Sequence, residues 1–344
     1  CRARSGPVFD HADTLSAVRD LDAIRAALGE DQISFYGASY GTQVGQQYAE
    51  LFPTRLRAMT IDSNMDHSTT SAARYLATAT ADLEGSFDAF ADWCARTANC
   101  PLYGQGVRVT WDRLHAKAEA GTLTDPGTGQ AISGYDLRNE LFRAMYQPSK
   151  TWYPFATRLR TLDSDRGTAA PSRLAAADEA VGYSWQAIWC SDWKWQVSGF
   201  AELRAYRDLA AAIAPHTKLI PYWSDITSCL GWPAKVNNPQ HRLSITHAPK
   251  ILIVKSAHDI ATPSAWNFAV ASQIRNSVLL SYDGIGHGQY YQGSTCVKSA
   301  IETYLTDLVT PAPGTHCPAV YPTTPPPPAA THTADVRRPV HAVG

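Results

Sequence analysis

The chain has 344 residues, 44% of them hydrophobic and 18% charged, so it can bury a large core in one elaborated domain or two. Its formal net charge is -1 and it has no run of Lys or Arg, which argues against nucleic acid or an anionic membrane surface as the main partner. No uninterrupted apolar stretch approaches the roughly 18 residues of a membrane span, and no apolar signal region follows Cys1-Arg2-Ala3-Arg4. We therefore expect a globular chain without a membrane span.

The N-terminal part predicts alternating helices and strands. Thr14 is expected to cap a helix that stops at Gly29. The apolar residues of this helix recur at helical spacing, at Leu15, Val18, Leu21, Ile24 and Leu28. The short apolar run 33–36 predicts a strand, the helical spacing after it ends at Pro53, and residues 56–61 predict a second buried strand.

The segment YGASYGTQ lies where the first strand passes into a helix. Gly37-Ala38-Ser39-Tyr40-Gly41 matches the G-x-S-x-G nucleophile elbow, in which a sharp turn exposes a serine hydroxyl above a sheet. Such a turn is strained and crowded, and Gly37 and Gly41 fit that need. An ordinary glycine-rich turn is the alternative interpretation. If the elbow is real, the backbone N-H of Tyr40 is one donor of the oxyanion hole.

Residues 67–245 differ from the rest. This region predicts helices such as Ala72 to Arg96 and Tyr135 to Tyr146, with many tryptophans and no succession of strands. We interpret it as a helical cap inserted into a core made of residues 1–66 and 246–317. The tryptophans of the segment 185–196 either line a substrate cleft or pack the cap against the core, and packing is the favoured interpretation.

The C-terminal part returns to strands. Residues 250–255 and 277–282 predict strands, with a helix from Ser264 to Ile274 between them. Alternating strands and helices favour the α/β class, with a parallel sheet flanked by helices. From 318 to 344 the chain is rich in proline and predicts an extended or disordered tail.

A serine nucleophile needs a base and an acid that orients the base. In the α/β-hydrolase order these follow the serine as acid then histidine, on loops after later strands. Asp259 follows the strand at 250–255 and His287 the strand at 277–282, so Ser39, Asp259 and His287 are the expected catalytic residues. Asp62 also ends a strand and is a rival acid, but Asp259 is favoured because its loop precedes the histidine strand as the fold expects. His258 adjoins the acid and is interpreted as structural.

Seven cysteines occur without a C-x-x-C pair or the spacing of a zinc site, so disulfides are expected rather than a metal. Because seven is an odd number, Cys1 is left without a partner in this sequence, and it is either a free thiol or bonded to a cysteine upstream. Disulfides indicate an exported protein. Sequential pairing is the simplest hypothesis among the possible connectivities, and it joins Cys94 to Cys100, Cys190 to Cys229 and Cys296 to Cys317.

The chain resembles the tripeptidyl aminopeptidase family of secreted bacterial serine peptidases, which are α/β-hydrolases related to proline iminopeptidases. The resemblance rests on DLDAIRAALGEDQISFYGASYGTQVGQQYAELFP around Ser39, and on KILIVKSAHDIATP, GIGHGQYYQGSTCVKSAIETYL and GTHC towards the C-terminus. It implies that Ser39 is the nucleophile, Asp259 the orienting acid and His287 the general base, with no cofactor. It also supports the pairing of Cys296 with Cys317.

The resemblance implies a serine exopeptidase that releases short peptides, tripeptides above all, from polypeptides with a free N-terminus. The candidates for a cap carboxylate that binds the substrate's amino group are Asp192, Glu202 and Asp225, and a solvated surface charge is the favoured interpretation of each. Family members carry an N-terminal section with an oxyanion loop and the first strands, which this sequence lacks, so we expect the strand at 33–36 to be an edge. The alternatives are an esterase, lipase or proline iminopeptidase of the same fold, a catalytically impaired fragment, and a non-catalytic exported binding protein.

Overall fold

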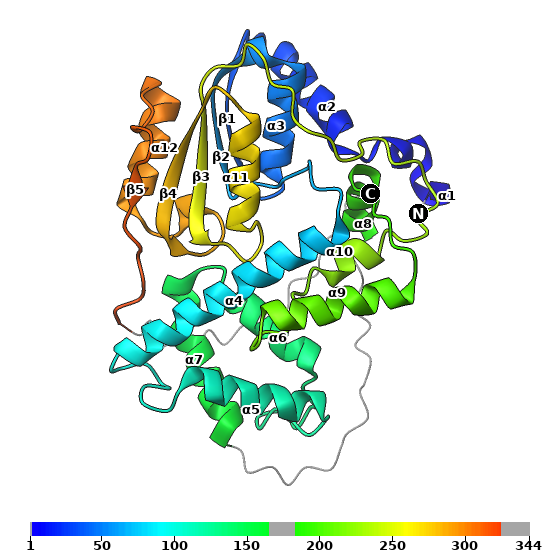
Figure 1. The fold of residues 1–344 in the computed structure, drawn as a ribbon. Coiled ribbons are helices and arrows are strands. Elements are labelled where there is room, and N and C mark those ends of the chain that lie inside the picture. The colour runs from blue at the N-terminus through cyan, green and yellow to red at the C-terminus, as the bar shows by residue number, and fades with distance from the viewer. Residues whose placement is uncertain (1, 165–182, 325–344) are drawn as a thin grey trace, which may run out of the picture.

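The computed structural model describes residues 2–164 and 183–324, and its centre is a parallel sheet (Figure 1). The strand order is β1-β2-β3-β4-β5, and every neighbouring pair is parallel. The four predicted strands are confirmed, and each ends a little beyond the apolar run that predicted it. The strands are β1 (Ile33–Ala38), β2 (Leu56–Asp62), β3 (Ile251–His258), β4 (Ser277–Ile285) and β5 (His316–Cys317).

Within the described residues β1 is an edge strand that pairs only with β2, as expected for the strand before the elbow. Helices cover the sheet and fill the region beyond its carboxyl ends (Figure 1). They are α1 (Arg2–Ser5), α2 (Thr14–Ala27), α3 (Gly41–Leu51), α4 (Ala72–Arg96), α5 (Val107–Glu119), α6 (Gly134–Ala144), α7 (Pro148–Ser164), α8 (Tyr183–Asp192), α9 (Phe200–Ile213), α10 (Trp223–Thr227), α11 (Ser264–Gln273) and α12 (Thr295–Asp307), with short 3-10 turns at Gly6–His11, Pro53–Arg55 and Gln289–Tyr291.

The two faces of the sheet bury alternate side chains of the same strands. In β3, Ile251 and Ile253 join the core shared with α2, α3 and α11. Leu252 and Val254 join a second core shared with α12. All four side chains are fully buried. A strand buried on both faces is apolar throughout, which is why the run ILIV predicts a central strand of a parallel sheet.

Helices α4 to α10 form a separate layer next to the carboxyl ends of the strands (Figure 1). The predicted helix over Ala72–Arg96 is confirmed to the residue as α4. In the described part of this layer the β pairing is one isolated bridge, between Thr124 and Ala131. The core of the layer is aromatic, and four tryptophans stack in series with ring centroids 5.3, 4.7 and 5.3 Å apart, namely Trp185, Trp189, Trp193 and Trp195.

The sequential disulfide pairing is confirmed. One disulfide closes the loop after α4, one ties α8 to the segment after α10, and one ties α12 to β5. Cys1 lies outside the described residues. The bonded pairs are Cys94–Cys100, Cys190–Cys229 and Cys296–Cys317.

The structure corrects two expectations, one for the N-cap of α2 and one for the start of the C-terminal tail. The N-cap of α2 is Asp13 and not Thr14, because the Asp13 carboxylate accepts the Ser16 N-H at 2.9 Å. The chain after 317 also begins as part of the packed body, since Tyr321 stacks on Trp152 with ring centroids 5.1 Å apart. The remainder of the predicted tail, from 325, lies outside the described residues. No helix in 2–164 or 183–324 is both long and apolar enough to cross a bilayer.

The turn between β1 and α3 is the sharpest feature near the sheet edge. Ser39 has a φ of +57°, a left-handed conformation that is rare for residues other than glycine. A Cβ on Gly37 would lie 2.6 Å from the Gly41 carbonyl oxygen, so crowding does exclude a side chain there. A Cβ on Gly41 would meet nothing within 4 Å, so the expectation that both glycines are required by crowding is wrong for Gly41.

The two glycines provide a matched pair of variants. We expect Gly37→Ala to destabilise the protein by about 1–3 kcal/mol, because the clash is with backbone. Gly41→Ala should stay within about 1 kcal/mol of the parent, since it starts a helix in open space. Urea unfolding measures both, and equal stability of the two variants would contradict this account of the turn.

Candidate active site

The predicted catalytic residues follow three strands at one edge of the sheet. Ser39 comes directly after β1, Asp259 after β3 and His287 shortly after β4. Because the strands are parallel, their carboxyl ends lie at the same edge, where open α/β sheets bind ligands. The helical layer α4 to α10 faces this edge (Figure 1).

The structure brings His287 and Asp259 together. His287 Nδ1 lies 2.9 Å from Asp259 Oδ1 and 3.1 Å from Oδ2, which assigns the ring proton to Nδ1 and leaves Nε2 free to accept. The Asp259 side chain is 1% exposed. It also accepts hydrogen bonds from the N-H groups of Ala261 and Thr262 and from the Thr262 hydroxyl, at 2.8, 3.0 and 2.9 Å. These bonds hold the carboxylate in one orientation beneath the imidazole.

The pKa of His287 is raised above its usual value. Burial alone lowers that pKa, since it disfavours the imidazolium, but the charge and hydrogen bond of Asp259 outweigh burial, with help from the charge of Asp62. The Tyr146 ring packs edge-on against the imidazole with centroids 5.3 Å apart. The arrangement favours a histidine that can accept a proton and remain stable as a cation.

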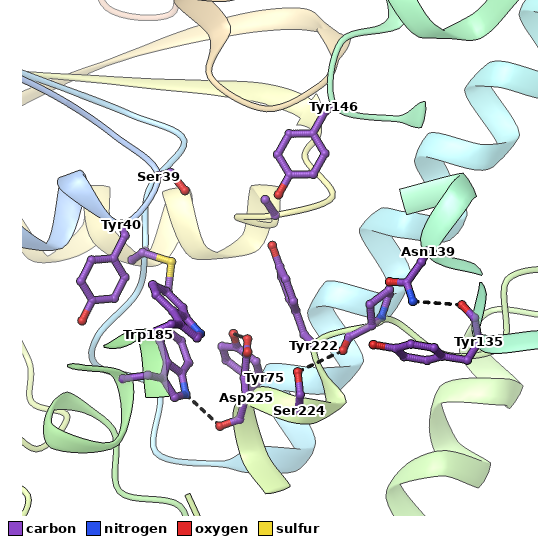
Figure 2. Close-up of a pocket in the computed structure, with 14 residues that line it drawn as sticks. Ser39, Tyr40, Tyr75, Tyr135, Asn139, Tyr146, Trp185, Tyr222, Ser224 and Asp225 are labelled. Carbon is purple, nitrogen blue, oxygen red and sulfur yellow. Dashed lines mark hydrogen bonds between the residues drawn. The ribbon is translucent and has the colours of Figure 1, made fainter. Parts of the chain in front are cut away.

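Ser39 lines a cavity of about 400 Å³ between the sheet edge and the helical layer. Figure 2 shows Ser39 and Tyr40 on one wall and Asp225 with Ser224 on another. Tyr146, which packs on His287, lines the same cavity, so the His287–Asp259 pair lies beside it. Among the described residues no hydrogen bond joins the Ser39 hydroxyl to His287.

Tyr40 is the N-cap of α3, where backbone N-H groups have no partner within the helix. In the described part of the chain no backbone carbonyl accepts from the Tyr40 N-H. A helix N-terminus also carries partial positive charge. The Tyr40 amide can therefore bind an anionic oxygen formed at Ser39.

The structure separates the three candidate cap carboxylates. Asp225 lines the cavity, is 8% exposed and accepts one side-chain hydrogen bond, from the Tyr75 hydroxyl at 2.7 Å. Burial raises the pKa of Asp225 from 3.8 to about 7, although the bond from Tyr75 opposes that rise.

The other two carboxylates are already bonded and lie outside this cavity. Asp192 is fully buried and accepts hydrogen bonds from Thr14, from the Tyr40 hydroxyl and from Asn238. Burial raises its pKa despite these bonds. Glu202 accepts from Ser198 and Tyr206, and their hydrogen bonds lower its pKa to about 2.

The rival residues have other contacts. Asp62 does not touch the imidazole of His287, and its carboxylate accepts backbone N-H groups from the loop after it. His258 bonds Asp82 of α4 at 3.3 Å and lies on a partly exposed surface. In the ranges that the structure describes, no group of three or more His, Cys, Asp or Glu could hold a metal ion.

Several residues that shape the site carry no signal of their own in the sequence. Asp82 accepts the N-H groups of Asp259 and Ser264, at 3.1 and 2.6 Å, and so ties α4 to the loop of the acid. Tyr75, Tyr146 and Tyr222 line the cavity. Each lies in or beside a helical stretch where an aromatic residue indicates only a buried face.

The parallel sheet, the strained serine turn and the order of serine, aspartate and histidine define an α/β-hydrolase. A comparison with protein families agrees, because the family described as TAP-like protein matches residues 219–317. This match over the C-terminal part agrees with the resemblance to tripeptidyl aminopeptidases.

Among the curated relatives, some carry peptidase names and one is named carboxylesterase B, from Mycobacterium tuberculosis. The serine protease Hip1 of Mycobacterium tuberculosis is 30% identical over 331 residues, which cover 89% of this chain and 62% of the relative. A tripeptidyl aminopeptidase of Streptomyces lividans is 30% identical over 326 residues, covering 89% of this chain and 58% of the relative. The chain thus spans 62% and 58% of the length of these relatives.

Solved structures of α/β-hydrolases also match. The match to a proline iminopeptidase of Mycobacterium smegmatis covers 86% of this chain and 71% of the iminopeptidase chain, with 14% identity and a TM-score of 0.37. The overlap is too low for a comparison of the two sites.

The charge of Asp259 is expected to control the titration of His287. We expect Asp259→Asn to lower the pKa of His287, because the amide oxygen keeps a hydrogen bond but the charge is lost. Titration of the imidazole by NMR measures this shift, with assignment from His287→Gln. Asp283→Asn is the matched control, since Asp283 bonds the exposed His316 instead. An unchanged His287 titration in Asp259→Asn would contradict the electrostatic account.

Proposed function

We propose that this chain is part of a serine peptidase that cleaves peptides through an acyl-enzyme on Ser39. The observation that carries the proposal is the His287–Asp259 pair, buried beside a cavity that Ser39 lines. The match of residues 219–317 to the TAP-like family and the peptidase names of two relatives support it. Three disulfides favour an exported protein.

Each residue has a role that its geometry suits. His287 Nε2 would take the proton of the Ser39 hydroxyl as the oxygen attacks the substrate carbonyl, and Asp259 would stabilise the resulting imidazolium. The Tyr40 N-H would bind the oxyanion of the tetrahedral intermediate. His287 would then donate its proton to the leaving amine, and water would release the acyl group by the same steps in reverse. No cofactor is needed for this chemistry.

Asp225 supports the finer proposal of an exopeptidase that acts at free N-termini. Among the described residues the Asp225 carboxylate has no cationic partner, and its oxygens have one side-chain donor between them. A buried carboxylate in this condition gains stability from a bound ammonium group. The α-amino group of a peptide whose carbonyl lies at Ser39 would supply that charge from within the same cavity.

The remaining walls of the cavity fit short peptides. The aromatic rings of Tyr40 and Trp185 lie on the side of the cavity near Ser39 (Figure 2), and Trp189 also lines the cavity. We propose that residues 67–245 act as a cap that closes the cleft beyond Asp225, so that only a chain end can enter. The product would be a short peptide, of tripeptide length by analogy with the Streptomyces relative's name.

Labelling by a fluorophosphonate tests the nucleophile. The native protein should be labelled at Ser39, and both Ser39→Ala and His287→Ala should abolish labelling, because the serine hydroxyl is a weak nucleophile without its base; His287→Ala should also cleave peptides more slowly by about 10³-fold or more. Mass spectrometry of the labelled peptide identifies the site. Absence of labelling in the native protein would favour a non-catalytic binding protein.

Substrates with free and acetylated N-termini test the anchor. Asp225→Asn should lower kcat/KM for free tripeptidyl amides by about 10²-fold, because the ammonium group loses its buried partner. The activity on acetylated substrates and short-chain esters should change little. Glu202→Gln is the matched control, a cap carboxylate outside this cavity. Equal rates on free and acetylated substrates in the native protein would instead support an esterase.

The pH profile gives a second readout of the same anchor. Asp225 must be ionised to bind an ammonium, so the preference for free over acetylated substrates should be present above the pKa of Asp225, about 7, and lost as pH falls through it. The substrate's amino group loses its charge near a pH of about 8, which closes the window at the other side. Asp225→Asn should abolish this dependence.

A further inference from the structure

The loop that carries His287 is held by the end of β2. Three consecutive backbone N-H groups after His287 donate to side chains of two neighbouring residues. The Gly288 N-H donates to Ser63 Oγ at 2.8 Å, the Gln289 N-H to Asp62 Oδ1 at 2.9 Å and the Tyr290 N-H to Asp62 Oδ2 at 3.0 Å. The two oxygens of Asp62 therefore each bind a different amide of the loop.

The same residue holds the turn of the nucleophile. The Ser39 N-H donates to the backbone carbonyl of Asp62 at 3.1 Å. Asp62 thus binds the serine turn through its backbone and the histidine loop through its side chain. One residue at the end of β2 fixes the position of the β1 turn relative to the β4 loop.

The residues that hold the loop are buried. Asp62 and Ser63 are both fully buried, and the Tyr36 hydroxyl donates to Asp62 at 2.9 Å. Ser63 has a φ of +61°, a strained conformation that the Ser63 N-H bond to Val254 on β3 helps to retain. Such strain persists only where the surroundings determine the conformation, and here it aims the Ser63 hydroxyl at the Gly288 N-H.

The charge of Asp62 also acts on His287. Asp259 and Asp62 both raise the pKa of His287, while Tyr146 packs on its ring as a neutral neighbour. Burial raises the pKa of Asp62, but the hydrogen bonds from Gln289, Tyr290 and Tyr36 oppose that rise. No Lys or Arg is paired with Asp62 among the described residues, so its hydrogen-bond donors are neutral groups.

We propose that Asp62 and Ser63 are positioning residues for the catalytic base: they hold the His287 loop in register with the Ser39 turn, and the Asp62 carboxylate stabilises the imidazolium together with Asp259. The proposal rests on the proposed role of His287. Asp62 was a rival for the role of the orienting acid, and its geometry gives it a different task. It acts on the backbone of the loop and through its charge, without touching the imidazole.

Asp62→Asn tests the proposal in the full chain. The variant keeps the shape of the side chain but turns an NH₂ group towards one loop amide and removes the charge. We expect the pKa of His287, measured by NMR, to fall, and fluorophosphonate labelling of Ser39 to slow by about 10- to 10²-fold. KM for peptide substrates should stay nearly unchanged, because Asp62 does not line the cavity.

Asp66→Asn is the matched control. Asp66 is a buried aspartate four residues further on, whose carboxylate accepts from Ser68 and Thr69 and does not contact the loop. It should leave both the His287 pKa and the labelling rate as in the native protein. A folded Asp62→Asn variant with native labelling and a native His287 titration would overturn the proposal.

Ser63→Ala covers the case in which Asp62→Asn does not fold. It removes the hydroxyl that accepts from the Gly288 N-H and from the Gln289 side-chain amide, so labelling should slow by a few-fold while the retained Asp62 charge keeps the His287 pKa unchanged. Native labelling in Ser63→Ala would then count against the proposal. If the native protein is not labelled at all, the proposed function fails, and the NMR titrations of His287 still decide whether Asp62 acts on it.

Discussion

The pairing of β2 with β3 is the constraint on which the candidate site depends. It joins Met59 to Ile251 and Asp62 to Val254, residues from two parts of the chain that are separated by the whole helical layer. Because the pairing is parallel, it puts the serine turn and the aspartate and histidine loops at one edge. The buried apolar faces of β3 fix this register, since a slip by one residue would exchange the side chains between two different cores.

Four buried carboxylates near this edge have different roles because their surroundings differ. Asp259 is bonded to an imidazole and to loop donors, which makes it an orienting group. Asp62 and Asp192 are saturated by neutral donors and join chain segments to each other. Asp225 alone among these four lines the cavity, and it accepts a single side-chain hydrogen bond, so burial raises its pKa to about 7.

The strands β1 to β4, the serine turn and the sequential disulfide pairing could be predicted from the sequence, and the structure also brings together the predicted histidine and aspartate, whose catalytic roles stay a prediction. The run ILIV and the motif around Ser39 depend on neighbours in sequence, and a charged residue just after a buried strand is visible without coordinates. The choice among Asp192, Glu202 and Asp225 was not visible, since it depends on contacts such as Asp192 with Thr14, 178 residues apart. The roles of Asp13 and Gly41 were missed for a related reason. Hydrogen-bond direction and free space are properties of the folded backbone, and residue type does not report them.

The energetics of Asp225 bear on where substrate specificity resides. A pKa of about 7 in place of 3.8 means that the ionised carboxylate is disfavoured in the folded protein by on the order of a few kcal/mol. The folded protein binds a proton at Asp225 more tightly than the unfolded chain does, so this group makes stability fall as pH rises between these two pKa values. A neutral residue of the same shape would remove that penalty. In the proposed mechanism the sheet edge would supply a nucleophile, a base and an oxyanion donor, which would serve esters and peptides equally. A destabilising carboxylate in the cavity makes physical sense where a ligand of opposite charge compensates it, and the proposed ligand is the amino end of a peptide. The cap rather than the sheet would then decide which bonds are cleaved.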